Sequence, residues 1–286
     1  MAILIDFNQV MIASLFMSIG NHTNVDVDEN VVRHMFLNSI RANRRKFSGE
    51  YGEIVICADG KSSWRKNVFP YYKSGRKKSR EESELDWTEL FRIMNVIREE
   101  LHTFFPYKVL HFDQLEADDI IGTVCQQYGT VLENGAEKFL ILSGDKDYIQ
   151  LHRYANVKQY SPTMKKWIEN SNPDKYLSEH ILRGDSGDGI PNILSPDNCF
   201  AVGERQKPMT SKRIAEFTSN PDAMDETTKS RFARNKTLID LSMIPEDYKR
   251  QVISEYEKEK NVRRSGLMEF FMSRGLKHLM ADLQDF

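Results

Sequence analysis

Four short apolar runs that each lead into an aspartate constrain the fold of this chain more than any other feature. They are AILID at 2–6, EIVICAD at 53–59, YKVLHFD at 107–113 and KFLILSGDKD at 138–147. Runs of Ile, Leu and Val without polar alternation are typical of strands buried on both faces. Helical periodicity lies between them, at 31–47 and 87–105. This alternation predicts an α/β fold with a mostly parallel central sheet flanked by helices.

Acidic side chains follow these strands, at the edge where parallel sheets place their binding sites. Clustered like charges cost stability, but divalent cations bound between them reverse that cost. Ligand sets made only of oxygen suit Mg²⁺ or Mn²⁺. The acids in question are Asp6, Asp59, Asp145 and Asp147, together with Glu116, Asp118 and Asp119 after the third run.

A second acidic group lies in LRGDSGDGIPN at 182–192, which contains Asp185 and Asp188. These two residues are three positions apart, so they can face the same site, or one can simply cap a helix. The seven histidines fall in no metal-binding motif. We expect them to be ordinary surface or core residues.

The segment 61–80 is strongly basic, with eight Lys or Arg and no acid. It also contains Trp64, Phe69, Tyr71 and Tyr72. One interpretation is a solvated charged face. The other is a nucleic-acid surface on which cations contact phosphates and rings contact bases. The composition of the segment leaves both interpretations open.

The remaining composition excludes several classes of protein. The chain has 286 residues, of which 40% are hydrophobic and 29% charged. No apolar run approaches the ~20 residues of a membrane span, so no membrane association is expected. The three cysteines are scattered and show no zinc-binding spacing, which favours a reducing cytoplasm.

Together these motifs resemble the 5′-nuclease (flap endonuclease) family, which includes the 5′-nuclease domains of bacterial DNA polymerase I. The resemblance covers nearly the whole chain and is strongest to the ribonuclease H branch of T-even phages. Its markers are LIDF at 4–7, ICAD at 56–59, YYKSGRKKSREES at 71–83, LEADD at 115–119, SGDKDYIQL at 143–151 and GDSGDGIPN at 184–192. The phage branch is favoured by VGERQKP at 202–208 and LIDLSMIP at 238–245.

The resemblance implies a PIN-like nuclease fold with two metal groups and phosphodiester hydrolysis as its chemistry. Two Mg²⁺ ions are expected, and Mn²⁺ can substitute. The first group matches Asp6, Asp59, Glu116 and Asp118, with Asp119 beside them. The second matches Asp145, Asp147 and Asp188, with Asp185 contributing directly or through water.

The resemblance also gives the basic segment a role, as a helical arch at about 61–95 above the active site. Lys73 and Arg76 are implied to contact the scissile phosphate, and Tyr72 to stack on the terminal base. Arg65 matches a further family arginine. The implied DNA-binding residues are Lys66, Lys77, Lys78 and Arg80 in the arch, and Arg205, Lys207, Lys212 and Arg213 beyond residue 200.

We therefore expect a nuclease domain at 1–181 and a helical DNA-binding region at 182–286, the latter with a helix-three-turn-helix-like element. That element departs from the family after Pro191, where NILSPDNCF replaces a short glycine-rich turn, so its potassium site is in doubt. The C-terminal LMADLQDF, at 279–286, is consistent with a partner-binding peptide or with a frayed amphipathic helix.

The function implied is a Mg²⁺-dependent 5′-to-3′ exonuclease and flap endonuclease that removes RNA primers during phage DNA replication. Its expected substrates are DNA flaps, nicked or gapped duplexes and RNA–DNA hybrids. A single-stranded-DNA-binding protein and a sliding clamp are expected partners of a monomer in the bacterial host cytoplasm. Two alternatives are an inactive nucleic-acid-binding protein of the same fold and a ribonuclease of the small-nuclease fold.

Overall fold

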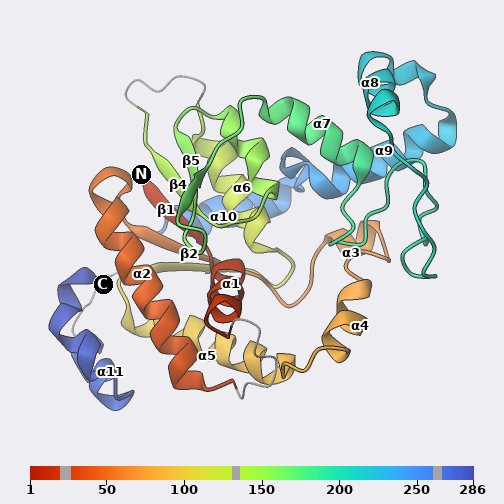
Figure 1. Cartoon of the computed structure of the whole chain (residues 1–286). Coiled ribbons are helices and arrows are strands. Elements are labelled where there is room, and N and C mark those ends of the chain that lie inside the picture. Colours follow the sequence, from red (N-terminus) through yellow and green to blue (C-terminus); the bar gives the residue numbers. More distant parts are fainter. Residues whose placement is uncertain (20–26, 131–135, 260–265) are drawn as a thin grey trace.

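The core of the molecule is one twisted sheet (Figure 1). The computed structural model describes residues 1–19, 27–130, 136–259 and 266–286. Within them the strand order is β3-β2-β1-β4-β5-β6, parallel except for the β5–β6 pair. The strands are β1 (Ala2–Asp6), β2 (Ile54–Ala58), β3 (Lys108–His111), β4 (Phe139–Leu142), β5 (Val157–Ser161) and β6 (Lys166–Ile168). The predicted α/β fold with a mostly parallel sheet is confirmed.

Alternate residues of the central strands supply two separate cores, because successive side chains of a strand point to opposite faces. Ile3 and Ile5 face one core, and Leu4 faces the other. The first is covered by α1 (Phe7–Ile19), α2 (Glu29–Tyr51), α5 (Trp87–Phe104), α11 (Leu267–Ser273) and the 3₁₀ helix η5 (Lys277–Asp285). The second is covered by α6 (Ala117–Tyr128), α10 (Glu246–Glu257) and the 3₁₀ helices η1 (Asp147–Arg153) and η3 (Leu241–Met243). Among the described residues, no helix is long and apolar enough to cross a bilayer.

Two further groups of helices border the strand ends that carry the acids. The basic segment forms α3 (Arg65–Val68) and α4 (Gly75–Glu81) before it enters α5, and α4 stands away from the sheet (Figure 1). The other group contains α7 (Pro173–Arg183), α8 (Ser211–Ser219), η2 (Pro221–Ala223) and α9 (Glu226–Ile239). The domain division expected at 181–182 falls inside α7, and Leu241, Ile244 and Val252 pack in the second core. That division stays a prediction.

The C-terminal segment is packed into the first core. Leu279 is buried, and Phe286 is 0% exposed and lies against Phe105 and Phe271. Arg41, on α2, makes ion pairs with Asp282 and Asp285. Burying its aromatic end stabilises LMADLQDF against this core, so the interpretation as a frayed helix is wrong, whereas the partner-binding interpretation stays a prediction.

A buried ion pair joins α2 to α5. The Arg33 guanidinium donates to both oxygens of Glu100, at 2.6 and 3.0 Å, and to Glu29 at 2.6 Å. Arg33 is 0% exposed, so its charge depends on these carboxylates. Removing one partner of a buried pair leaves a charge uncompensated, which is strongly destabilising.

We expect Glu100→Gln to lower the free energy of unfolding by about 2 kcal/mol, less than full loss of a buried pair because Glu29 remains. Urea denaturation would measure the change. Glu99→Gln is the matched control, because Glu99 is exposed and, within the described part of the chain, its ion pair is with Arg98. Equal stability of the two variants would contradict this account of the pair.

Candidate active site

Asp6 and Asp59 lie at the carboxyl ends of two neighbouring central strands. Asp6 is the last residue of β1, and Asp59 follows β2. Asp6 Oδ2 accepts hydrogen bonds from the Tyr148 hydroxyl at 2.9 Å and from the Ser143 hydroxyl at 3.2 Å. Burial raises the pKa of Asp6 to about 7, and the charges of Asp59 and Asp145 add to the effect. The carboxylates are thus crowded in a place that disfavours their negative charge.

The N-terminus of α6 brings a further set of acids to the same edge. Glu116 and Asp119 form a capping box, in which Asp119 Oδ2 accepts from the Glu116 amide at 2.9 Å. Asp59 Oδ1 accepts from the Ala117 amide at 2.8 Å, which ties β2 to the helix. The helix N-terminus favours these negative charges. Burial raises the pKa of Asp118, and Asp119 and Glu116 raise it further.

Arg65 lies beneath this helix end and holds it in place. Its guanidinium donates to Asp119 at 2.9 Å, to Glu116 at 3.1 Å and to the Leu238 carbonyl at 2.8 Å. Trp64 Nε1 donates to Asp119 at 3.2 Å. Asp119 is fully buried and both its oxygens are engaged, whereas Asp118 stays partly exposed. This geometry suits Arg65 and Asp119 to positioning their neighbours.

The arch residues contact the acids directly. Lys73 Nζ pairs with Glu116 Oε1 and lies 3.6 Å from Asp188 Oδ2, and the Arg76 guanidinium pairs with Asp188 Oδ1. Burial opposes the charge of Lys73, but Asp188 and Glu116 raise its pKa overall. Burial likewise works against Glu116, yet Lys73 and Arg65 bring the pKa of that carboxyl down to about 2. Cations and carboxylates therefore stabilise one another here.

The backbone of Lys73 is held in an unusual conformation. Its φ is 55°, in the left-handed region, and its amide donates to the Asp188 carbonyl at 2.7 Å. Such a conformation costs about 1–3 kcal/mol in a residue other than glycine and persists only where the surroundings impose it. The contact fixes the start of the arch against the acidic loop at 185–190.

Tyr72 requires a correction to its expected role. Its side chain is 1% exposed, so in this structure the ring offers no face to a base. Its hydroxyl lies 2.8 Å from Glu116 Oε2 and 2.9 Å from Asp188 Oδ2. A hydroxyl has one proton and can donate to one of them at a time. Tyr72 links the two groups of acids, and the neighbouring Tyr71 is the more exposed ring.

A second group of potential ligands forms where η1 meets the end of α7. The Asp147 amide donates to Asp145 Oδ1 at 3.0 Å, and Asp185 Oδ1 accepts from the Gly187 and Asp188 amides. Asp185 thus holds its own turn, whereas Asp188 faces the arch. Burial, followed by the charge of Asp145, raises the pKa of Asp147 to about 7.

His180 is a member of this group that the sequence analysis missed. Its Nε2 lies 3.2 Å from Asp185 Oδ2, and its Nδ1 lies 3.7 Å from Asp147 Oδ1. Burial lowers the pKa of His180, but the hydrogen bond to Asp185 and the charge of Asp147 raise it overall. The only signal in the sequence is its position on a helix just before GDSGDG.

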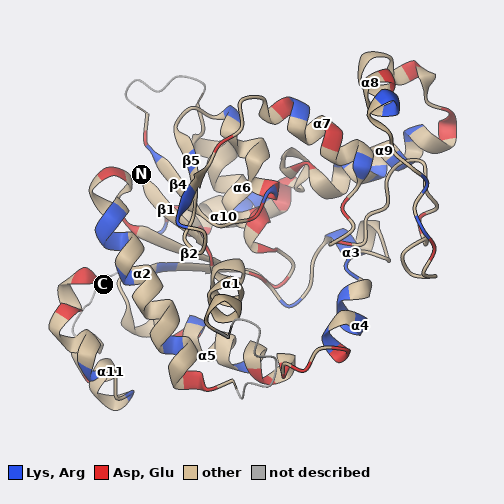
Figure 2. Ribbon diagram, viewed as in Figure 1, with Lys and Arg blue, Asp and Glu red and all other residues tan. Residues whose placement is uncertain are grey.

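The expected DNA-binding cations fall into two places. Lys66, Lys77 and Arg80 line a cavity of about 550 Å³ that also contains Asp59 and Glu116; Lys78 is exposed outside it. Arg80 packs over the rings of Trp87 and Phe91. The four later cations, Arg205, Lys207, Lys212 and Arg213, are exposed, and within the described ranges none has an ion-pair partner. Figure 2 shows both concentrations of basic residues, on α3–α4 and around α8–α9.

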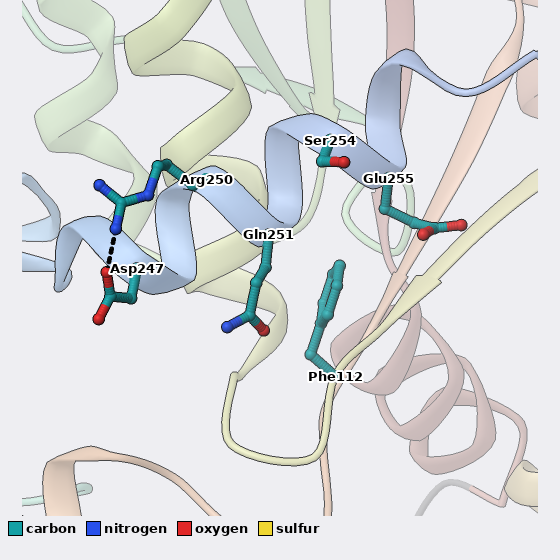
Figure 3. Close-up of a pocket in the computed structure, with 6 residues that line it drawn as sticks. All are labelled: Phe112, Asp247, Arg250, Gln251, Ser254 and Glu255. Atoms are coloured by element: carbon teal, nitrogen blue, oxygen red, sulfur yellow. Dashed lines mark hydrogen bonds and ion pairs between the residues drawn. The ribbon is translucent and has the colours of Figure 1, made fainter.

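Another hollow, of about 590 Å³, lies away from these acids between α10 and Phe112 (Figure 3). Asp247 pairs there with Arg250, while Glu255, two turns along α10, pairs with Lys258. Its charged groups are paired with residues three positions away in the sequence and do not converge on one point. The hollow therefore has no arrangement that suits catalysis.

Two family models match the chain. Residues 1–180 match the 5′-3′ exonuclease N-terminal resolvase-like domain, and residues 172–286 match the T4 RNase H C-terminal model. The chain is also 32% identical to the ribonuclease H of Enterobacteria phage T4, over 99% of this chain and 95% of that relative. This chain belongs to the 5′-3′ exonuclease family. The expected resemblance to 5′-nucleases and to the T-even phage branch is confirmed.

Solved structures of bacteriophage T5 proteins share the fold. The T5 5′-exonuclease with bound zinc ions has a TM-score of 0.57 and 16% identity, and covers 90% of this chain and 93% of its own. The T5 flap endonuclease in a complex with DNA and metal ions has a TM-score of 0.59 and 14% identity, covering 90% and 99%. At these identities the likeness concerns the fold of the chain.

Proposed function

We propose that this chain is a divalent-metal-dependent 5′-nuclease that hydrolyses phosphodiester bonds at the 5′ ends of DNA, or of RNA annealed to DNA, and that it also cuts flaps. One observation carries this proposal: acids from β1, β2 and α6 meet Lys73 and Arg76 at one edge of the sheet, in a chain related over its full length to a phage ribonuclease H. Cleavage of a 5′-labelled flap, with and without chelator, tests it.

The residues present fit divalent cations. Carboxylate oxygens of Glu116, Asp118 and Asp119 lie within 4.8 Å of one another, as do potential ligand atoms of Asp147, His180 and Asp185. Burial raises the pKa values of Asp6 and Asp118, and neighbouring carboxylates raise them further, so a bound cation would stabilise the charged form of both acids. We propose that Asp6, Asp59, Glu116 and Asp118 hold a first ion, and Asp145, Asp147 and Asp188 a second. Bound Mg²⁺ or Mn²⁺ supplies a water of lowered pKa and Lewis acidity.

The cations of the arch act on the substrate in this proposal. Lys73 and Arg76 contact the scissile phosphate and offset the charge that develops on it. Arg65 is a positioning residue, because it is buried behind Glu116 and Asp119. Tyr72 aligns Glu116 with Asp188 through its hydroxyl. The cavity beside α4 accepts the single-stranded 5′ end, whose phosphates face Lys66, Lys77 and Arg80.

The match to the RNase H C-terminal model argues against the small-nuclease-fold alternative. The retained acids argue against an inactive binding protein.

The biological proposal is removal of RNA primers from lagging-strand fragments by a monomer in the bacterial host cytoplasm. A single-stranded-DNA-binding protein and a sliding clamp are proposed partners. A potassium site near residues 192–213 is not part of the proposal.

Duplex binding is proposed to rest on the cations near α8. We expect log affinity for a flap substrate to fall linearly with log salt, because bound cations release counterions from DNA. Lys212→Ala should make that slope shallower by about one. Fluorescence anisotropy at several salt concentrations measures both. Lys249→Ala is the control, because the Lys249 ammonium already donates hydrogen bonds to the Glu246 carboxylate and to the Ser242 carbonyl. An affinity independent of salt would rule out phosphate contacts.

A further inference from the structure

Among the residues that the structure describes, His180 Nδ1, beside Asp147 and Asp185, has no hydrogen-bond partner. His180 Nδ1 is buried and lies 3.7 Å from Asp147 Oδ1, too far for a hydrogen bond. The other ring nitrogen, Nε2, lies 3.2 Å from Asp185 Oδ2 and donates to it. Buried polar atoms are usually paired, and this unpaired imidazole nitrogen lies 3.7 Å from a carboxylate oxygen, so an ion bound between the two would satisfy both.

We propose that His180 Nδ1 is a ligand of the second divalent cation, together with Asp147, and that Asp185 orients the ring. This inference rests on the proposed function. An imidazole that donates one N–H to a carboxylate and presents its other nitrogen to a metal is a common arrangement, in which the hydrogen bond fixes the tautomer and the ring orientation. Asp185 is held in turn by the Gly187 and Asp188 amides, so the ring has a fixed support.

The geometry is compatible with a shared cation. Divalent ions lie about 2.1 Å from imidazole nitrogen and carboxylate oxygen. Two such ligand atoms 3.7 Å apart subtend an angle of roughly 120° at the ion. Shifts of the side chains by less than an ångström would reduce this ligand–metal–ligand angle. A protonated ring bridging two carboxylates would instead bring its Nδ1–H to about 2.8 Å from Asp147. The observed distance of 3.7 Å between Nδ1 and Asp147 Oδ1 is too long for that hydrogen bond.

A nitrogen ligand changes which metal this site prefers. Mg²⁺ favours oxygen, whereas imidazole suits ions later in the first transition series. The first group offers only oxygen, from Asp6, Asp59, Glu116 and Asp118. The second site of this chain should therefore discriminate in favour of Mn²⁺ over Mg²⁺ more strongly than the first.

The test uses the full chain loaded with Mn²⁺ in the absence of DNA. Pulsed electron paramagnetic resonance should show the ¹⁴N modulation of a directly bound imidazole, and His180→Gln should abolish it. Calorimetry should show Mn²⁺ affinity at one site falling about 10–100-fold in that variant, with a smaller change for Mg²⁺. His180→Asn places an amide oxygen near the position of Nδ1. This variant should bind Mg²⁺ more tightly than His180→Gln does, but it should not regain the ¹⁴N modulation.

His152→Gln is the matched control, because His152 follows Asp147 on η1 and its ring already bonds Gln159 at 2.9 Å. It should keep the ¹⁴N signal. A wild-type spectrum without ¹⁴N modulation, or one unchanged in His180→Gln, would overturn the inference and identify His180 as a spacer between carboxylates. The proposed function fails separately: it falls if the wild-type chain does not cleave flaps with Mg²⁺, whatever the spectrum shows.

Discussion

Asp59→Asn and Asp118→Asn are each expected to abolish cleavage while binding to DNA survives. Each change removes a negative charge that the proposed first cation requires. Lewis-acid stabilisation by a metal is worth several kcal/mol, so the loss in rate should be on the order of a thousandfold or more. Single-turnover cleavage of a 5′-labelled flap measures it. DNA affinity should stay equal or rise, because a negative charge near the phosphates is lost.

The fold should tolerate both changes. Asp59 Oδ1 accepts from the Ala117 amide and Asp118 Oδ1 from the Asp119 amide, and asparagine keeps an acceptor oxygen at each position. Burial raises the pKa of both carboxyls, so neutral replacements should not lower the melting temperature of the metal-free protein. Asp113→Asn is the control: this acid also follows a strand, but it is exposed and lies near Lys61. Activity retained in Asp118→Asn would contradict the metal assignment.

Lys73→Ala should lower the single-turnover rate at saturating enzyme by on the order of a hundredfold or more, the scale of one transition-state contact. A cation at the scissile phosphate binds more strongly as charge develops, so its loss appears in the chemical step. Lys212→Ala is the matched comparison. Its side chain is exposed on α8, and its loss should weaken duplex binding while leaving the rate at saturation nearly unchanged.

A control is needed for the backbone of Lys73, because its φ of 55° is unfavourable for lysine and alanine alike, and alanine lacks the Nζ contact with Glu116 that helps to hold it. Lys73→Gly removes the same charge and tolerates that conformation. If the loss comes from the missing cation, both variants should be slow to a similar extent. A glycine variant with normal turnover would instead show that alanine strain disturbs the arch. If both variants cleaved at the normal rate, the basic segment at 61–80 would have to be interpreted as a solvated charged face.

Much of the fold was predictable because local patterns agree with the tertiary structure. The apolar runs became β1 to β4, and the helical patterns at 31–47 and 87–105 became α2 and α5. The C-terminal segment was harder. LMADLQDF has the pattern of a surface helix, and only contacts with Phe105 and Phe271, distant in sequence, show that its last residue is buried.

The candidate site was likewise only partly predictable from the sequence. That acids gather at one strand edge follows from a parallel sheet, but which carboxylates remain free depends on distant residues. Asp119 is engaged by Arg65, 54 positions earlier, and Tyr72 is buried against residues of α7 and α9. His180 belongs to no motif, and only the packing of α7 on η1 brings its ring to Asp147. The roles of the individual site residues therefore remain predictions.

Cleavage of two 5′-labelled substrates, a DNA flap and an RNA–DNA hybrid, tests the central claim most directly. Each is incubated with the full chain in Mg²⁺ and in EDTA, with Asp118→Asn as the inactive control. The account predicts short labelled products from both substrates in Mg²⁺, and none in EDTA or with the variant. Substantial cleavage in EDTA, or no cleavage of either substrate in Mg²⁺ or Mn²⁺, would contradict it.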